Sequence, residues 1–148
     1  MIETEGYRVG IDLTDVSQVA DAVARFGGRY LNRLYTTHEL ACARRGTTFD
    51  PQSLAARFAA KEATIKVLRP TGAQPPWTSI ELRRLPTGAC EIALSGPAAA
   101  MARSEGITSL AVSVTHEATM AASVVIATCR PSAVSAENGE PSQSEGRQ

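Results

Sequence analysis

The sequence has no apolar run near the roughly 18 residues that cross a membrane, and its start carries Glu3 and Glu5 where a signal peptide would be basic and then apolar. It also has no excess of charge, because 15 lysines and arginines stand against 15 aspartates and glutamates. A formal net charge of zero gives no general attraction to nucleic acid or to an anionic membrane. We therefore expect a cytoplasmic protein with neither nucleic acid nor membrane as partner, which recognises its ligands through local sites.

Cysteine and lysine are both scarce. The three cysteines, Cys42, Cys90 and Cys129, are odd in number and far apart, unlike the close pairs of a zinc site or a disulfide framework. We interpret them as small buried residues. The two lysines, Lys61 and Lys66, lie five positions apart, whereas arginine supplies the other 13 basic residues. A compact ammonium whose charge state can be tuned is what phosphate chemistry often needs and what a guanidinium does not supply, so the two lysines hint at such chemistry.

The length and composition favour one globular domain. A length of 148 residues leaves no room for a second full domain. Hydrophobic residues make up 43% and charged residues 20%, which is a globular composition. We place the domain at residues 1–130. Residues 131–148 are rich in Ser, Glu, Gly, Pro and Gln and have almost nothing to bury, so they are predicted to form a disordered tail.

The hydrophobic pattern predicts an α+β fold, with a mostly antiparallel sheet packed against one long helix and shorter helices. Asp15 is expected to cap the first helix, which ends at Gly27-Gly28, and Thr37 to cap the third. Residues 44–51 are interpreted as a loop, and the last two strands as a hairpin. Strands are predicted over 7–13, 78–85, 89–94, 108–116 and 120–128, and the other helices over 29–35, 38–44, 52–69 and 97–104.

Apolar side chains alternate along the first predicted strand and share one face of it: Tyr7, Val9, Ile11 and Leu13. This period is typical of a half-buried strand, with the apolar face inside. Asp12 then lies on the opposite face. A carboxylate there could serve the start of the next helix through the helix dipole, although Asp15 is the better cap.

Glu62 borders the apolar stripe of the long predicted helix, about 40° from Phe58 and about 60° from Ile65 at roughly 100° per residue. A carboxylate at this position needs a partner. One candidate is Lys66, four residues on, in an ordinary helix-stabilising pair. If Glu62 instead converges with Asp12, the two carboxylates suit Mg²⁺, which completes its coordination with waters and substrate phosphates. Lys66 would then reach the same phosphates.

Two further side chains have two interpretations each. His116 ends a predicted strand and shares a face with three apolar residues, so it is either a core histidine or a site residue at the strand's end. Arg57 is either a solvated charge or a phosphate contact. Other chemistries lack their parts, since the sequence has no Gly-rich phosphate loop, no nucleophile-elbow serine and no metal-spaced His/Cys cluster.

Three stretches together resemble the holo-acyl-carrier-protein synthase family of 4′-phosphopantetheinyl transferases. They are residues 10–12 (Gly-Ile-Asp), 58–66 (Phe-Ala-Ala-Lys-Glu-Ala-Thr-Ile-Lys) and 112–117 (Val-Ser-Val-Thr-His-Glu), the last followed by Ala121-Ala122. Each stretch is short, and their order and spacing over residues 7–128 make the combination specific.

The resemblance implies a 4′-phosphopantetheinyl transferase-like fold and a Mg²⁺-dependent enzyme. Such an enzyme moves the phosphopantetheine arm of coenzyme A onto a serine of an apo acyl carrier protein of fatty-acid or polyketide type, releasing adenosine 3′,5′-bisphosphate. Asp12 and Glu62 would hold Mg²⁺, and Glu62 and Lys66 would be the catalytic residues, with Lys66 at the phosphate being cleaved. His116 and Arg57 would bind coenzyme A phosphates. The family also implies a homotrimer in which a neighbouring subunit completes the coenzyme A pocket.

One position departs from the family pattern. Gln18 stands where many members carry an arginine that meets acidic residues of the carrier, which favours a less acidic carrier such as a polyketide one. Two other functions compete with the transferase: a non-catalytic module of the same fold that binds coenzyme A or a carrier, and a Mg²⁺-dependent nucleotide hydrolase. The intact set of Asp12, Glu62 and Lys66 argues against the module.

Overall fold

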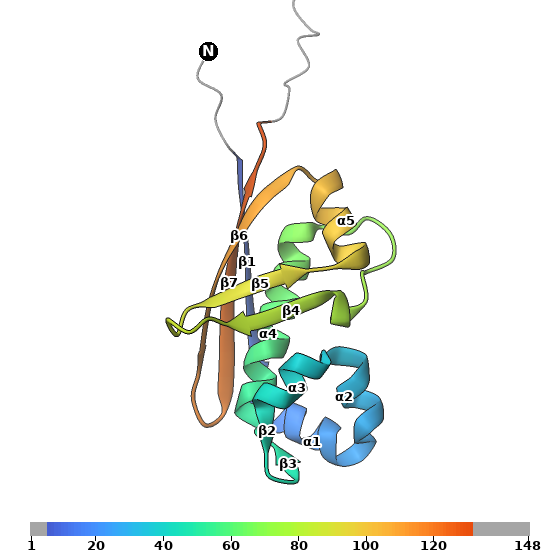
Figure 1. Ribbon diagram of the computed structural model, residues 1–148, viewed down its shortest axis with the longest axis vertical. Coiled ribbons are helices and arrows are strands. Elements are labelled where there is room, and N and C mark those ends of the chain that lie inside the picture. Colours follow the sequence, from blue (N-terminus) through green and yellow to red (C-terminus); the bar gives the residue numbers. More distant parts are fainter. Residues whose placement is uncertain (1–5, 132–148) are drawn as a thin grey trace, which may run out of the picture.

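The computed structural model describes residues 6–131 and shows a long helix lying along a three-stranded antiparallel sheet (Figure 1). The predicted tail falls, apart from Pro131, outside the described residues. Every predicted helix and strand is present with slightly shifted ends, so the α+β class is confirmed. The elements are β1 (Gly6–Asp15), α1 (Val16–Phe26), α2 (Gly28–Leu34), α3 (Thr37–Ala43), β2 (Arg44–Arg45), β3 (Thr48–Phe49), α4 (Pro51–Leu68), the 3₁₀ turn η1 (Trp77–Ser79), β4 (Ile80–Arg84), β5 (Cys90–Leu94), α5 (Gly96–Ser104), β6 (Ile107–His116) and β7 (Met120–Cys129).

The main sheet has the strand order β1-β7-β6, and the β6–β7 hairpin is the one predicted from the sequence. Its register places residues of the three strands in rows. Asp12 lies opposite Ser123, which lies opposite Val114. Because directly opposite residues share a face, Asp12 is on the side of the sheet where Val125 and Ala127 pack against α4.

The other face of β1 carries the four apolar side chains, and they are exposed. Tyr7, Val9, Ile11 and Leu13 each keep 64–66% of their surface accessible. The expectation that this face lies inside is therefore wrong for the single chain. Helix α4 packs against the opposite face of β1, where Gly10 has no side chain and lets the helix backbone come close.

Helix α4 forms where local signals and packing agree. The Asp50 side chain accepts a hydrogen bond from the backbone N–H of Gln52 (3.0 Å), and Pro51 takes the first helical position, where its missing N–H costs nothing. Arg69 ends the helix in the left-handed conformation (φ 53°). Alanine-rich turns are buried along most of the helix, which makes α4 the centre of the domain.

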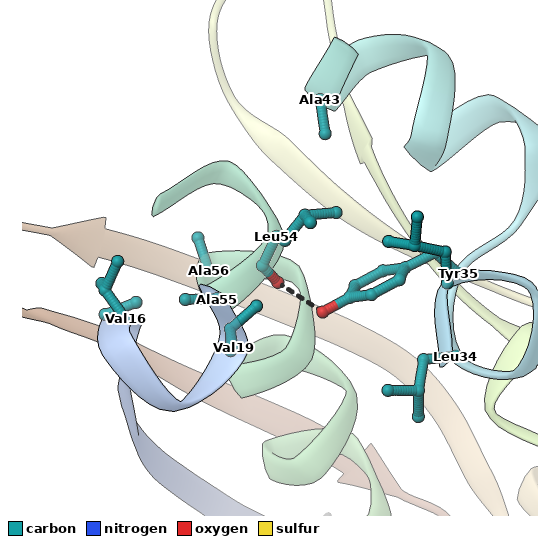
Figure 2. Packing of buried hydrophobic residues seen from close by; sticks show 10 residues of the cluster. Val16, Val19, Leu34, Tyr35, Ala43, Leu54, Ala55 and Ala56 are labelled. Atoms are coloured by element: carbon teal, nitrogen blue, oxygen red, sulfur yellow. Dashed lines mark hydrogen bonds between the residues drawn. The ribbon is translucent and has the colours of Figure 1, made fainter. Parts of the chain in front are cut away.

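Helices α1–α3 form a cap at one end of α4 (Figure 1). Val16 and Val19 of α1 lie in one cluster with Tyr35 and residues of the first turns of α4 (Figure 2). The buried Tyr35 hydroxyl donates to the carbonyl oxygen of Leu54 (3.1 Å), so the aromatic ring brings no unsatisfied polar group into the core.

Helix caps agree with the sequence in one case and correct it in another. Asp15 caps α1 as predicted, because its carboxylate accepts from the N–H groups of Ser17 and Gln18. The cap of α3 is Thr36 and not Thr37. Its hydroxyl accepts from the Glu39 N–H, while the Glu39 carboxylate accepts from the Thr36 N–H, a reciprocal pattern that needs the two residues to be three positions apart.

Two other expectations are wrong. Residues 44–51 contain a small hairpin, β2–β3, where a loop was predicted, because strands of two residues are too short to show a period. Cys42 is exposed, and Cys90 and Cys129 are only half-buried, so they are not buried core residues. No helix within residues 6–131 is long and apolar enough to cross a membrane.

Candidate active site

Asp12 of β1 and Lys66 of α4, 54 positions apart in the sequence, lie side by side. The Lys66 ammonium donates to the carbonyl oxygen of Ile11 and lies 3.4 Å from Asp12 Oδ1. Lys66 is half-exposed, whereas the Asp12 side chain keeps only 17% of its surface. The second Asp12 oxygen, Oδ2, accepts a hydrogen bond from the hydroxyl of Thr14 (2.9 Å). The pair is therefore held from both sides and open to solvent on the lysine side.

Gly10 is the reason why α4 can come this close. A side-chain carbon at position 10 would lie 2.1 Å from the carbonyl oxygen of Ala63 and 3.1 Å from Cβ of Lys66. Only a residue without a side chain lets the helix backbone rest on the strand at this point. The Gly-Ile-Asp stretch thus contains both Gly10, which lets the helix come close, and Asp12, whose carboxylate contacts Lys66.

Glu62 lies one turn before Lys66 and shares the same electrostatic environment. Burial raises the pKa of the Glu62 carboxyl, the Asp12 charge raises it further, and Lys66 opposes the increase. Lys66 forms its ion pair with Asp12. The helix-stabilising Glu62–Lys66 pair considered from the sequence is therefore not the contact that Lys66 makes. The charges of Asp12 and Lys66 both act on Glu62, so the two carboxylates and the ammonium lie in one electrostatic environment.

The donor set fits a magnesium ion. Asp12 and Glu62 offer hard oxygen ligands, and residues 6–131 hold no group of three or more His, Cys, Asp or Glu side chains that would make an all-protein cage. Mg²⁺ is bound through one or two carboxylates together with substrate phosphates and waters. Ser123 supports this fit, because it is 2% exposed, its hydroxyl has no hydrogen-bond partner within residues 6–131, and the residue lies directly across from Asp12. A buried hydroxyl without a partner is suited to an ordered water.

His116 lies on the same side of the sheet as Asp12. It pairs with Ala121, which pairs with Thr14, so it stands two strands, or about 10 Å, from Thr14 at the usual strand spacing. His116 is exposed, which excludes the core-histidine interpretation.

Arg57 is not brought to the cluster. At about 100° per residue it lies about 180° around α4 from Lys66 and about 140° from Glu62. Its Nη1 donates to the carbonyl oxygen of Ser53 (3.1 Å) and to the Ser53 hydroxyl (2.6 Å), and its buried Nε has no partner among the described residues. Arg57 is thus tied to its own helix through Nη1.

Lys61 has a structural role that the sequence did not show. Its ammonium, fully buried, lies 2.8 Å from the equally buried Glu39 carboxylate and donates to the carbonyl oxygens of Trp77 (3.0 Å) and Ile80. The other Glu39 oxygen accepts from the Leu82 N–H (2.9 Å). Burial lowers the pKa of Lys61, and the Glu39 charge opposes this. The interpretation that both lysines mark phosphate chemistry is therefore wrong for Lys61. The Thr36-x-x-Glu39 capping pattern is the signal that could have indicated a role for Glu39.

Comparison with known proteins points to one family. The family model described as the 4′-phosphopantetheinyl transferase superfamily matches residues 8–129, which include Asp12, Glu62, Lys66 and His116. The chain is 39% identical over 120 residues to the holo-acyl-carrier-protein synthase of Desulforudis audaxviator, covering 80% of this chain and 90% of that one.

The fold is also similar to solved structures. The Helicobacter pylori holo-acyl-carrier-protein synthase in complex with coenzyme A aligns with a TM-score of 0.71 at 28% identity, over 81% of this chain and 99% of that chain. The Mycobacterium tuberculosis acyl carrier protein synthase aligns with a TM-score of 0.62 at 30% identity, over 82% and 96%. These similarities confirm the fold that the sequence resemblance implied.

Proposed function

The chain belongs to the holo-acyl-carrier-protein synthase family of the 4′-phosphopantetheinyl transferase superfamily, and we propose that the Asp12–Glu62–Lys66 cluster is the site of its reaction. The enzyme transfers the phosphopantetheine arm of coenzyme A to an apo acyl carrier protein. The observation that carries the assignment of the site is the close approach of Asp12 to Lys66, with Glu62 one turn away on α4.

We assign Asp12 and Glu62 to Mg²⁺. When bound, the ion would neutralise charge on the pyrophosphate, which is the main requirement of phosphoryl transfer. The raised pKa of Glu62 supports this role, because burial and the Asp12 charge both disfavour the ionised carboxylate. A divalent cation held by Glu62 and Asp12 would offset this cost.

Lys66 is the side chain of this cluster that supplies a positive charge. Its half-exposed ammonium can leave Asp12 for a phosphate oxygen without breaking into the core. There it stabilises the negative charge that grows on the phosphate being cleaved. Glu62 and Lys66 are therefore the catalytic residues of this proposal.

His116 and Arg57 are assigned to other phosphates of coenzyme A. Coenzyme A carries a 3′-phosphate in addition to its pyrophosphate, so cationic contacts at some distance from Lys66 are required. The exposed His116 imidazole and the half-buried Arg57 guanidinium are the groups that the family resemblance assigns to these contacts.

The exposed apolar face of β1 supports assembly of this chain into a homotrimer. Tyr7, Val9, Ile11 and Leu13 form a continuous apolar strip, and Ile126 of β7, opposite Val9, extends it with 42% of its surface exposed. Contiguous apolar surface of this kind marks an interaction site. In a trimer, a neighbouring subunit would cover the strip and complete the coenzyme A pocket. The cytoplasmic location expected from the start of the sequence stays a prediction.

The test is intact-protein mass spectrometry of an apo acyl carrier protein after incubation with the enzyme, coenzyme A and Mg²⁺. The expected result is the gain of one phosphopantetheine, absent when EDTA is added. If neither a fatty-acid nor a polyketide carrier gains mass while coenzyme A binds, the chain is the non-catalytic module. If adenosine 3′,5′-bisphosphate appears without a carrier, it is a hydrolase.

A further inference from the structure

We propose that Thr14 and Ser123 are positioning residues of the metal site, with Thr14 fixing the orientation of Asp12 and Ser123 binding a water of the hydrated cation. This inference rests on the proposed role of Asp12 as a metal ligand. It concerns two hydroxyl groups to which the proposed function assigns no role.

Thr14 has a buried hydroxyl with one partner. Its side chain is 8% exposed, and its Oγ1 donates to Asp12 Oδ2 at 2.9 Å. The two residues are separated by one position on β1 and so point to the same face. With Oδ2 held by Thr14, the carboxylate cannot rotate freely, and Oδ1 stays directed toward Lys66 and the open side of the site. Hydrogen bonds to ligating carboxylates orient them in this way in metal sites.

Ser123 has a buried hydroxyl without a hydrogen-bond partner in the part of the chain that the structure describes. The residue is 2% exposed, and its Oγ makes no hydrogen bond within residues 6–131. Burying a hydroxyl without a partner costs free energy, so a structure retains one where a ligand or water supplies the bond. On β7, Ser123 stands between Asp12 on one side and Val114 on the other, and only Asp12 is polar.

The two hydroxyls therefore flank one carboxylate from two directions, along β1 and across to β7. Mg²⁺ keeps several of its waters when it binds through carboxylates, and these waters need acceptors and donors of their own. Thr14 serves the ligand itself, and Ser123 serves a water.

The experiment measures Mn²⁺ binding to the full chain in the presence of coenzyme A, by the loss of the free Mn²⁺ signal in electron paramagnetic resonance. Thr14→Val removes the hydroxyl at nearly constant volume and is expected to weaken Mn²⁺ binding by about 10- to 100-fold, and Ser123→Ala by about 10-fold. Thr14→Ser keeps the hydroxyl and is expected to restore binding.

Thr64→Val is the matched control. Thr64 is also buried (0% exposed), but its hydroxyl donates to the carbonyl oxygen of Ala60 (2.7 Å) and not to the site. It is expected to lower the melting temperature while leaving Mn²⁺ affinity unchanged. If Thr14→Val or Ser123→Ala also leaves the affinity unchanged, the assignment of that residue is overturned.

The readout separates this inference from the proposed function. If the wild-type protein binds no Mn²⁺, the metal site and this inference both fail. If the wild type binds Mn²⁺ and all variants bind equally, only the inference fails. Failure of the wild type to modify a carrier would be seen in the mass-spectrometric test and would leave the binding comparison valid.

Discussion

Gly10 and Ala63 are in contact through backbone atoms, and a side-chain carbon on Gly10 would lie 2.1 Å from the Ala63 carbonyl oxygen. This approach of β1 to α4 sets the distance between Asp12 and Lys66. The site thus depends on a residue that carries no functional group.

Gly10→Ala should therefore push α4 away from β1, because the nearest atom is backbone and cannot rotate aside. Overpacking of this kind costs about 1–3 kcal/mol, which thermal unfolding will report. Activity should fall as well, since Asp12 and Lys66 separate. Gly72→Ala is the control, because nothing lies within 4 Å of that position. Equal effects of the two substitutions would contradict the role given to Gly10.

Glu62→Gln should abolish most activity and stabilise the metal-free protein. The raised pKa means that the folded state binds the Glu62 proton more tightly than the unfolded state, so this stabilisation is lost as pH rises above the ordinary value of 4.5 and through the folded pKa. At neutral pH the neutral amide avoids that loss. Loss of several kcal/mol of metal-assisted charge stabilisation predicts a rate at least about 100-fold lower.

The check is a pair of pH series, one of melting temperature without metal and one of phosphopantetheine transfer with Mg²⁺. The melting temperatures of wild type and Glu62→Gln should converge near pH 4, which is roughly the ordinary pKa of a glutamate, and should diverge toward pH 7. A variant that is less stable than wild type at neutral pH would support a purely structural Glu62.

The two lysines should respond in opposite ways to replacement by methionine. Lys61→Met leaves the Glu39 carboxylate buried and unpaired, which costs about 3–5 kcal/mol. Lys66→Met removes a half-exposed pair worth about 0–1 kcal/mol, but takes the positive charge from the site. Denaturant unfolding and transfer rates together separate the two roles. A Lys66→Met protein with full activity would overturn the catalytic assignment.

Ile11→Arg should convert the assembled protein into monomers, because it places a charge in the middle of the exposed apolar strip of β1. Light scattering after size-exclusion chromatography measures the change. Phe26→Arg is the matched control, since Phe26 is 52% exposed on α1, away from this strip. If the wild type is already monomeric, the proposed homotrimer is wrong.

Gln18→Arg should speed the modification of an acidic fatty-acid carrier more than that of a less acidic polyketide carrier. Gln18 is exposed on α1, so the added charge acts through long-range attraction and its effect should shrink at high salt. Rates at two ionic strengths test this. A wild-type enzyme that strongly prefers the fatty-acid carrier would sink the idea that Gln18 reflects a less acidic partner.

The sequence by itself determined the elements and the order of the chemical groups. Glu62 and Lys66 lie on one side of α4 because helix geometry is local, and Asp12 lies opposite the apolar row of β1 because strand geometry alternates. The three-stretch resemblance added the family, which the comparisons confirmed. The Asp15 cap and the long helix followed from signals within a few residues.

The tertiary structure decided which surfaces meet. No local pattern shows that α4 covers the Gly10 face of β1 and leaves the apolar face exposed, because that choice depends on steric fit between distant segments. The Glu39–Lys61 ion pair joins positions 22 apart for the same reason, and the hydroxyls of Thr14 and Ser123 acquire their meaning only from what lies beside them. Local geometry follows from short-range sequence, whereas burial and partners depend on long-range packing.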